Sequence, residues 1–121
     1  MRLFALRGAN SVERNEANAI LDATDLLIRE LIARNSLTPQ AMVSCIFTLT
    51  HDLDAQFPAV AARRLGLERV PLLCAQEIPV PGALPAVIRV MVHYYAESDH
   101  DPQHVYLGAA EALRRDLSSA Q

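Results

Sequence analysis

One long stretch of the chain repeats its apolar residues at helical spacing, and several shorter stretches are apolar or alternate with polar positions. The long stretch predicts an amphipathic helix over residues 16–35, with Asn15 as its N-terminal cap and Asn35 at its left-handed end. Because Thr24 alone is polar in its apolar stripe, we expect this stripe to pack on a sheet. The stripe comprises Ala17, Ile20, Leu21, Thr24, Leu27, Ile28, Leu31 and Ile32.

The shorter stretches have the length and β-branched content of strands. Gly8 is expected to end the first strand through an unusual backbone angle, which leaves Arg7 at the strand's end. In the fourth strand, alternation places Arg89 and His93 on one side and Val90 on the other. The five predicted strands cover residues 2–7, 42–50, 70–74, 86–95 and 104–107.

Further helical signals lie between these strands. Thr38 and Pro39 predict a short helical turn, and Pro58 begins a second helix that Gly66 ends. A final helical stretch is expected over residues 108–115. The alternation of signals predicts an α/β or α+β class: a mixed sheet of about five strands packed by one long and shorter helices, in a single domain spanning residues 1–121.

The composition of the chain limits the kinds of partner and the cellular compartment that we expect for this domain. The 121 residues are 51% hydrophobic and 21% charged, with a net charge of −3, which argues against a nucleic-acid or anionic-membrane surface. No apolar run approaches the roughly 20 residues of a membrane helix, and the first residues lack a signal-peptide pattern. Cys45 and Cys74 lie in apolar runs, so we interpret them as reduced core thiols of a cytoplasmic protein.

Two charges interrupt otherwise apolar strands. Glu77 follows the third strand and Arg89 lies inside the fourth, on either side of a turn rich in proline and glycine. A charge in such a place is costly unless it is paired, so the two either pair with each other or bind a polar ligand. Together with Arg7 and Tyr106 they suggest a site for a small polyanion, because arginines fork onto carboxylates. Arg63 on the second helix could reach over the sheet edge, or be an ordinary surface charge.

Other chemistries have weaker support. The loop at residues 99–104 contains metal-ligand residue types, but its spacing fits no zinc pattern and Pro102 separates His100 from His104. Cys74 could be a nucleophile, although no base lies near it in the sequence. A glycine-rich phosphate loop and a dinucleotide fingerprint are both missing from the sequence.

Several short motifs occur along nearly the whole chain in a characteristic order. They are Arg7-Gly-Ala, Ser-Val-Glu before the long helix, Phe57-Pro-Ala with Arg63, Cys74-Ala-Gln-Glu77, Pro81-Gly82, Ile88-Arg89-Val90 and His104-Val-Tyr106-Leu. In these motifs the chain resembles the monofunctional chorismate mutases of the small trimeric, pseudo-α/β-barrel class. The resemblance implies the Claisen rearrangement of chorismate to prephenate in phenylalanine and tyrosine biosynthesis, with no cofactor and no metal, in a homotrimer whose active sites lie between subunits.

The resemblance also implies residue roles. Arg89 would donate to the ether oxygen whose bond breaks, Glu77 would accept from the ring hydroxyl, and Arg7 and Tyr106 would bind substrate carboxylate. The pocket would further be lined by Leu73, Cys74, Ala75 and Gln76, by Phe57, Ala59 and Arg63 of a neighbouring subunit, and by Arg114 closing from the C-terminal segment.

Two positions depart from the family pattern. The segment Leu113-Arg114-Arg115-Asp116-Leu117 lacks a proline that relatives commonly carry, and Val60 replaces a residue that is charged in some of them. Two alternatives stay open: a trimeric ligand-binding or regulatory protein that keeps the fold without catalysis, and a hydrolytic deaminase of reactive imines, since small trimeric proteins of that kind also place a site between subunits. Catalysis of the rearrangement requires Arg89 and Glu77, and both are present.

Overall fold

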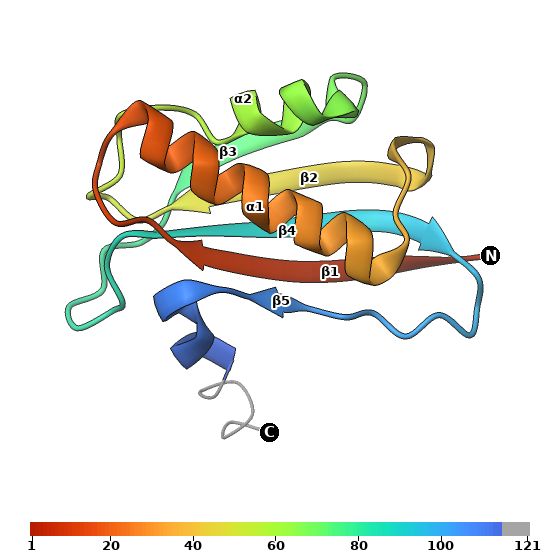
Figure 1. Cartoon of the computed structure of the whole chain (residues 1–121). Helices are drawn as coiled ribbons and strands as arrows, with labels where there is room; N and C mark the ends of the chain where they lie inside the picture. The colour runs from red at the N-terminus through yellow and green to blue at the C-terminus, as the bar shows by residue number, and fades with distance from the viewer. Residues whose placement is uncertain (115–121) are drawn as a thin grey trace.

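A computed structural model describes residues 1–114 of the chain. This part contains a five-stranded mixed sheet in the order β3-β2-β4-β1-β5, with α1 and α2 on the same face of it (Figure 1). The predicted α+β class and the mixed sheet are thereby confirmed. The elements are β1 (Arg2–Ser11), α1 (Ala17–Asn35), the 3₁₀ turn η1 (Pro39–Ala41), β2 (Met42–Leu49), α2 (Ala59–Ala62), the π turn η2 (Arg63–Leu67), β3 (Leu72–Gln76), β4 (Val87–Ala96), β5 (Val105–Tyr106) and the 3₁₀ turn η3 (Gly108–Ala110).

The last long strand in the chain lies in the middle of the sheet. β4 is antiparallel to both β1 and β2, while β3 runs parallel to β2 and β5 parallel to β1. The parallel pair β2 and β3 needs a crossover connection, and α2 lies in it; α1 joins β1 to β2, which run in the same direction on either side of β4. β4 therefore pairs with two strands that are distant from it and from each other in the sequence, and it can bring their side chains together.

The main core lies between the sheet and α1. Most of the predicted stripe of α1 is buried, with Ile20 and Leu27 fully enclosed, while Ala17 and Ile32 at its ends are half-buried. The stripe packs on strand residues such as Leu6 and Phe47. Each such aliphatic side chain contributes about 1.5–3 kcal/mol when fully buried. The polar member of the stripe, Thr24, is satisfied because its hydroxyl donates to the carbonyl of Ile20 at 2.7 Å.

Both predicted ends of the long helix are wrong in detail. Asn15 does not cap the helix; its side-chain oxygen accepts from the backbone N–H of Asp54 and Ala55, each at 3.0 Å. The left-handed residue is Ser36, with φ 52°, whereas Asn35 is buried. The Asn35 side chain instead bonds the backbone of Gln103 through both its oxygen and its nitrogen, a contact across 68 residues that local patterns could not reveal.

Gly8 does not end the first strand. β1 continues to Ser11, and Gly8 is absent from the glycines with positive φ. A Cβ built on Gly8 would lie 3.0 Å from a methyl of Leu31 and 3.1 Å from methyls of Leu27 and Val90. Gly8 is thus required by the close approach of α1 to the sheet, and Arg7 lies inside the strand rather than at its end.

Other boundaries shift by a few residues. The third strand is β3 at Leu72–Gln76, later than the predicted 70–74, and the last is reduced to Val105–Tyr106. Gly66 does have the expected positive φ, at 91°, where the second helix turns. The predicted final helix is present in part, as η3 and a helical turn through residue 114; its end at Arg115 and the segment to Leu117 lie outside the described residues.

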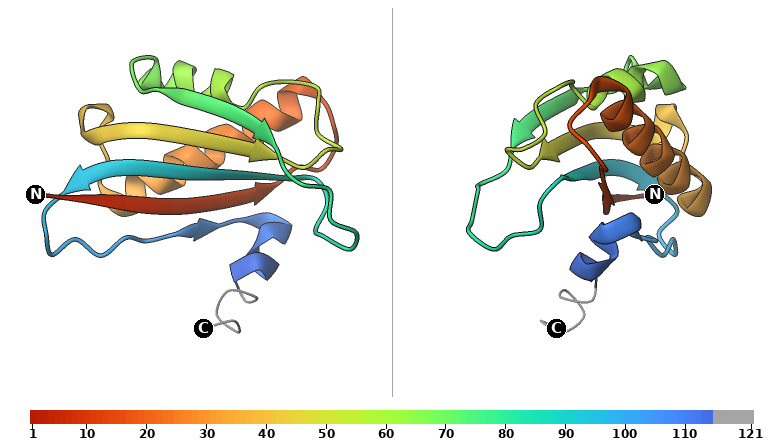
Figure 2. Two further views of the ribbon diagram at one scale, coloured as in Figure 1. Left: turned by 180° about the vertical axis from the view of Figure 1, so that it is seen from behind. Right: turned by 60° about the vertical axis from the view of Figure 1, so that its left-hand side comes forward.

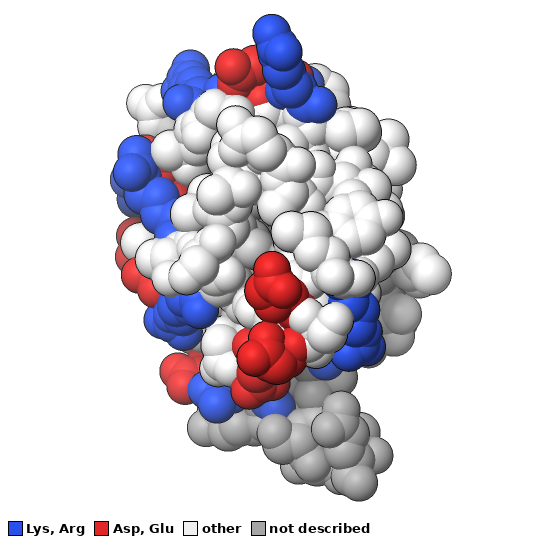
Figure 3. All heavy atoms as spheres, turned by 90° about the vertical axis from the view of Figure 1, so that its right-hand side faces the viewer, with Lys and Arg blue, Asp and Glu red and all other residues white. Residues whose placement is uncertain are grey.

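The face of the sheet opposite the helices is largely uncovered, as Figure 2 shows from behind. The C-terminal segment near η3 covers one end of this open face, where Ala9, Val87 and Ala110 form a second, small core. On the side of the molecule in Figure 3, basic and acidic side chains are interspersed at the top, along one edge and in the lower part, while most of the rest of this side is uncharged. No helix within residues 1–114 is long and apolar enough to cross a membrane.

Candidate active site

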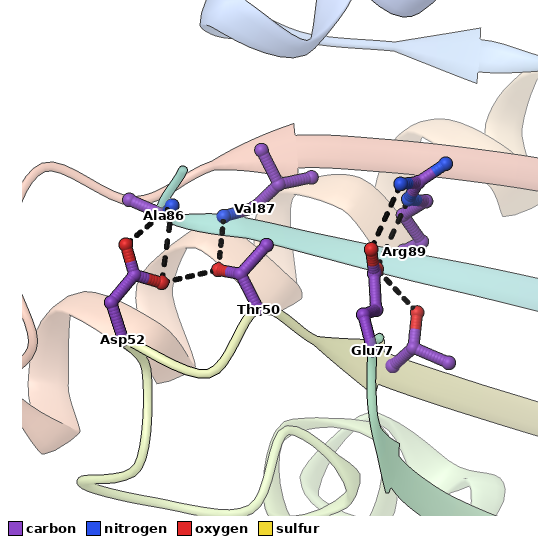
Figure 4. Close-up of polar contacts among 7 residues, drawn as sticks. Thr50, Asp52, Glu77, Ala86, Val87 and Arg89 are labelled. Carbon is purple, nitrogen blue, oxygen red and sulfur yellow. Dashed lines mark hydrogen bonds and ion pairs between the residues drawn. The ribbon is translucent and has the colours of Figure 1, made fainter. Parts of the chain in front are cut away.

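The two charges that interrupt the strands form an ion pair. Arg89 donates from Nε to Oε2 of Glu77 at 3.0 Å and from Nη2 to Oε1 at 2.8 Å (Figure 4). The side chain of Glu77 is 13% exposed and that of Arg89 is 49% exposed. The fork is bidentate, which fixes the guanidinium plane, and within the described residues its Nη1 has no hydrogen-bond partner. That edge of the fork can therefore donate to a ligand.

The end of β2 holds the carboxylate in this pair. Thr48 lies opposite Arg89 in the sheet and donates its hydroxyl to Oε2 of Glu77 at 2.7 Å. The backbone N–H of Glu77 also donates to the carbonyl of Leu49 at 2.8 Å. Glu77 is thus held by main chain and side chain together, and Oε1 retains capacity to accept a further proton donor.

A cavity of about 150 Å³ adjoins the pair. Glu77 and Arg89 line it together with Thr50, His51 and the loop that connects β3 to β4. Three prolines, at positions 79, 81 and 85, stiffen this loop. The ion pair therefore lies at a hollow bounded by a stiff loop and the end of β2.

Arg7 and Tyr106 lie on the same open face as Arg89. Ala9 pairs with Arg89 on one side and with Tyr106 on the other, so the three side chains belong to neighbouring strands. Arg7 is two residues before Ala9, a diagonal neighbour of Arg89 at a typical Cβ separation of about 7–8 Å. The Arg7 guanidinium makes no hydrogen bond or ion pair within residues 1–114, which leaves a positive charge beside the neutral Arg89–Glu77 pair.

The structure divides the predicted lining residues of β3 between two faces. Leu73 and Ala75 pair with Ile46 and Thr48 and share the open face with the ion pair, whereas Cys74 pairs with the core residue Phe47. Cys74, Ala75, Gln76 and Phe57 line a second cavity of about 320 Å³. Because β3 is an edge strand, its residues border both cavities.

The remaining predicted residues lie on other elements: Phe57, Ala59 and Arg63 do not line the hollow beside the ion pair, and Arg114 belongs to the C-terminal segment. Phe57 is 67% exposed at the start of the α2 region, and Arg63 is exposed on the turn that follows α2. Ala59 is buried in the main core, so its side chain does not face solvent. Arg114 is exposed and is the last residue that the structure describes.

The weaker candidates are placed elsewhere. His100 bonds the hydroxyl of Tyr94 at 2.7 Å, and His104 accepts the backbone N–H of Arg7 at 3.0 Å through Nδ1. Within residues 1–114 no group of three His, Cys, Asp or Glu side chains is arranged to hold a metal ion. Cys45 and Cys74 are both free thiols; Cys45 is a core residue as predicted, but Cys74 is partly exposed at the larger cavity.

Sequence patterns missed the polar end of β2. Thr48, Thr50 and Asp52 contact the Glu77–Arg89 region, yet they appeared in the sequence only as the end of a strand and a loop. β2 ends at Leu49, so Thr50 and Asp52 lie in the connection that follows it, and their spacing gave no signal of their partners. The groups that these three side chains contact are set by the pairing of β2 with β4, which are distant in the sequence.

Comparisons with known proteins agree on one family. The family model for chorismate mutase type I matches residues 3–117. The chain is 48% identical over 118 residues to chorismate mutase AroH of Thermus thermophilus, covering 96% of this chain and 97% of that protein. It is 40% identical over 120 residues to chorismate mutase AroH of Bacillus subtilis, covering 98% and 94%. A solved chorismate mutase from Clostridium thermocellum matches with a TM-score of 0.88 and 44% identity, over 90% of this chain and 98% of that one.

Proposed function

The chain belongs to the type I chorismate mutase family and is a chorismate mutase, and from this premise we propose which residues perform the reaction. The enzyme converts chorismate to prephenate: within one molecule a C–O bond breaks while a C–C bond forms. No proton, electron or group leaves the molecule. The protein therefore needs to hold the reactive shape and to stabilise the charge that develops.

Arg89 is the main catalytic residue in this proposal. As the C–O bond breaks, negative charge grows on the ether oxygen, and the unpartnered Nη1 edge of Arg89 donates to it. The bidentate contact with Glu77 supports this role, because the guanidinium is already oriented before substrate binds. Arginine suits the position because it remains protonated and its fork is rigid.

The neighbouring groups bind the substrate around that contact. Oε1 of Glu77 accepts from the ring hydroxyl, while Arg7 and Tyr106 bind a carboxylate. The substrate carries two carboxylates, and Arg7 supplies positive charge that the Arg89–Glu77 pair does not. Holding the carboxylate and hydroxyl at fixed points favours the compact chair-like conformer, which supplies orientation in advance of the reaction.

The site is completed between subunits of a homotrimer. Two observations support this assembly: the predicted site residues are spread over two faces of the chain, and large apolar side chains are exposed near them. Phe57, Leu73 and Val80 are 67%, 61% and 58% exposed, more apolar surface than an isolated domain needs to leave in water. Phe57 and Arg63 of a neighbouring subunit, with Ala59 behind them, would cover the open face of β3, and Arg114 would close the pocket. We also propose that the enzyme is cytoplasmic.

A chorismate assay combined with a change at Arg89 tests these roles. The absorbance of chorismate should fall when the pure protein is added, without metal or cofactor. Arg89→Lys should lower kcat on the order of 10²–10³-fold, the loss typical of one donor to a developing oxyanion, with a smaller change in KM. Arg29→Lys on the outer side of α1 is the matched control and should leave both constants unchanged. Normal turnover in Arg89→Lys would refute the role of Arg89.

Light scattering tests the assembly. A homotrimer should have three times the 13.3 kDa mass of the chain. Phe57→Glu, which puts a charge on the proposed neighbour wall, should lower both the trimer fraction and the activity. A monomer with full activity would contradict a site between subunits.

A further inference from the structure

Ala86, the residue just before β4, has an unusual backbone. Its φ is +54°, one of two positive values at non-glycine residues within residues 1–114. The left-handed region costs a residue with a Cβ about 1–2 kcal/mol, so neighbouring contacts must hold it there. Ala86 lies three residues before Arg89 and directly after the stiff proline loop.

The contact that holds Ala86 is a carboxylate. The backbone N–H of Ala86 donates to both oxygens of Asp52, at 3.0 and 3.2 Å. The carbonyl of Ala86 accepts from the N–H of Val12 at 2.8 Å. Asp52 lies 34 residues before Ala86 in the sequence, in the connection after β2, and Figure 4 shows its carboxylate turned toward the start of β4.

Thr50 extends this contact along β4. Its hydroxyl donates to Oδ1 of Asp52 at 2.5 Å and accepts from the N–H of Val87 at 3.0 Å. Its backbone N–H also donates to the carbonyl of Val87 at 3.1 Å. The hydroxyl proton is therefore committed to Asp52, which orients the lone pair that receives Val87. The pKa of Asp52 lies below its ordinary value, mainly because of the Thr50 hydroxyl, although burial opposes the shift.

The connection between β3 and β4 is consequently anchored twice by the end of β2. Thr48 and Leu49 hold Glu77 at its beginning. Just after β2, Asp52 holds Ala86 at its end and Thr50 holds Val87. The first anchor includes Thr48, which lies opposite Arg89, and the second ends at Val87, two residues before Arg89.

We propose that Asp52 is a positioning residue for catalysis: by holding Ala86 in its left-handed conformation, it sets the path of β4 and thereby the direction of the Arg89 fork. This inference rests on the proposed role of Arg89. Asp52 itself does not touch the substrate. A misplacement of about 1 Å at a catalytic group can lower a rate about 100-fold, so a contact of this kind has a measurable effect.

The test combines the loss of the carboxylate with relief of the strain. Asp52→Ala should lower kcat about tenfold or more with KM changed by less than about threefold, because Arg89 acts mainly in the transition state. Ala86→Gly alone should be close to the unchanged enzyme. Asp52→Ala/Ala86→Gly should recover most of the lost kcat, since glycine adopts the left-handed region without a Cβ penalty. Asp25→Asn, an exposed carboxylate on α1, is the matched control.

The outcomes separate this inference from the proposed function. Failure of Arg89→Lys to lose turnover refutes the role of Arg89 itself. Loss in Arg89→Lys with normal kcat in Asp52→Ala overturns only the positioning role, as does a double variant whose losses simply add. If Asp52→Ala does not fold, Asp52→Asn, which retains one acceptor for the N–H of Ala86, is compared with and without Ala86→Gly by the same criterion. All rates are taken per folded protein, so lower stability alone cannot imitate the result.

Discussion

The two faces of β4 share one backbone but differ in the polarity and the exposure of their side chains. Ile88 and Val90 face the helices and are 0% and 4% exposed, while Arg89 between them faces the open side with its side chain half exposed. On the covered face, hydrophobic burial and close packing stabilise the fold. On the open face, a hydrogen-bonded ion pair holds the Arg89 guanidinium in a fixed orientation. One strand therefore stabilises the protein with alternate residues and, in the proposed mechanism, binds the substrate with the others.

Exchanging residue types between these faces has the largest expected effect. Val90→Arg should unfold the protein or lower its free energy of unfolding by roughly 3–5 kcal/mol, because the charge is buried without a partner. Arg89→Leu should keep the fold and abolish turnover, at a cost of about 1–3 kcal/mol for leaving Glu77 with fewer partners. Urea denaturation and the chorismate assay measure the two effects. A folded, active Val90→Arg variant would contradict the division between faces.

A single added methyl probes the packing of the covered face. Gly8→Ala should lower the free energy of unfolding by about 1–3 kcal/mol, because the new Cβ would meet methyls of Leu27, Leu31 and Val90 at 3.0–3.1 Å. Activity per folded molecule should change little. Ala5→Val on the exposed side of β1 is the control and should change stability by less than about 0.5 kcal/mol. Equal effects at positions 5 and 8 would show that α1 does not pack as closely as described.

The two thiols lie on the helix side of the sheet but differ in burial, Cys45 in the core and Cys74 on the edge strand. Burial, with a smaller contribution from Cys74, raises the pKa of Cys45 to about 12, so iodoacetamide at pH 8 should leave Cys45 unmodified in the folded protein. Cys74 borders the larger cavity and should be alkylated first. Mass spectrometry of peptides distinguishes the two. Cys74→Ser should keep activity within roughly tenfold, the worth of one hydrogen bond, and complete loss in a folded variant would revive a covalent mechanism.

The smallest expected effect is a loss of stability at low pH through His104, which lies just before the edge strand β5. Burial, and secondarily the charge of Arg7, lowers the pKa of His104, whose Nδ1 accepts the N–H of Arg7. The unfolded chain therefore binds more protons at this histidine, and its contribution to stability is present above about pH 6.5 and is lost as the pH falls through the folded value. The urea midpoint should fall modestly on acidification, and less in His104→Asn. An identical pH dependence in that variant would exclude His104 as the cause.

Local patterns were sufficient where a residue's environment follows from its own element. The stripe of α1 and the alternation of β4 are properties of spacing, and both are observed. The errors occurred where distant contacts decide. Asparagine is a common residue at both ends of helices, yet the side chains of Asn15 and Asn35 accept hydrogen bonds from the backbone N–H groups of Asp54 and Gln103. Glycine often marks the end of a strand, yet Gly8 lies inside β1, where the close packing of α1 leaves little room for a Cβ.

The candidate site shows the same limit. Glu77 and Arg89 could be singled out from the sequence because charges in apolar strands need a partner. The structure shows that the two residues are each other's partner. The roles of Arg7 and Tyr106 stay predictions, supported by their place on the same face. Thr48 and Asp52 could not have been identified, because their contacts depend on the register between strands that are distant in the sequence.

The sequence by itself determined the periodicities: which residues form helix or strand, and which side of each element is apolar. Those depend on interactions between residues at most a few positions apart. The tertiary structure alone decided that β4 lies between β1 and β2, and hence that Thr48 faces Arg89 and that Asp52 reaches Ala86. Strand order and register are set by the packing of the whole sheet against α1, in which every strand constrains the others, so no segment carries that information alone.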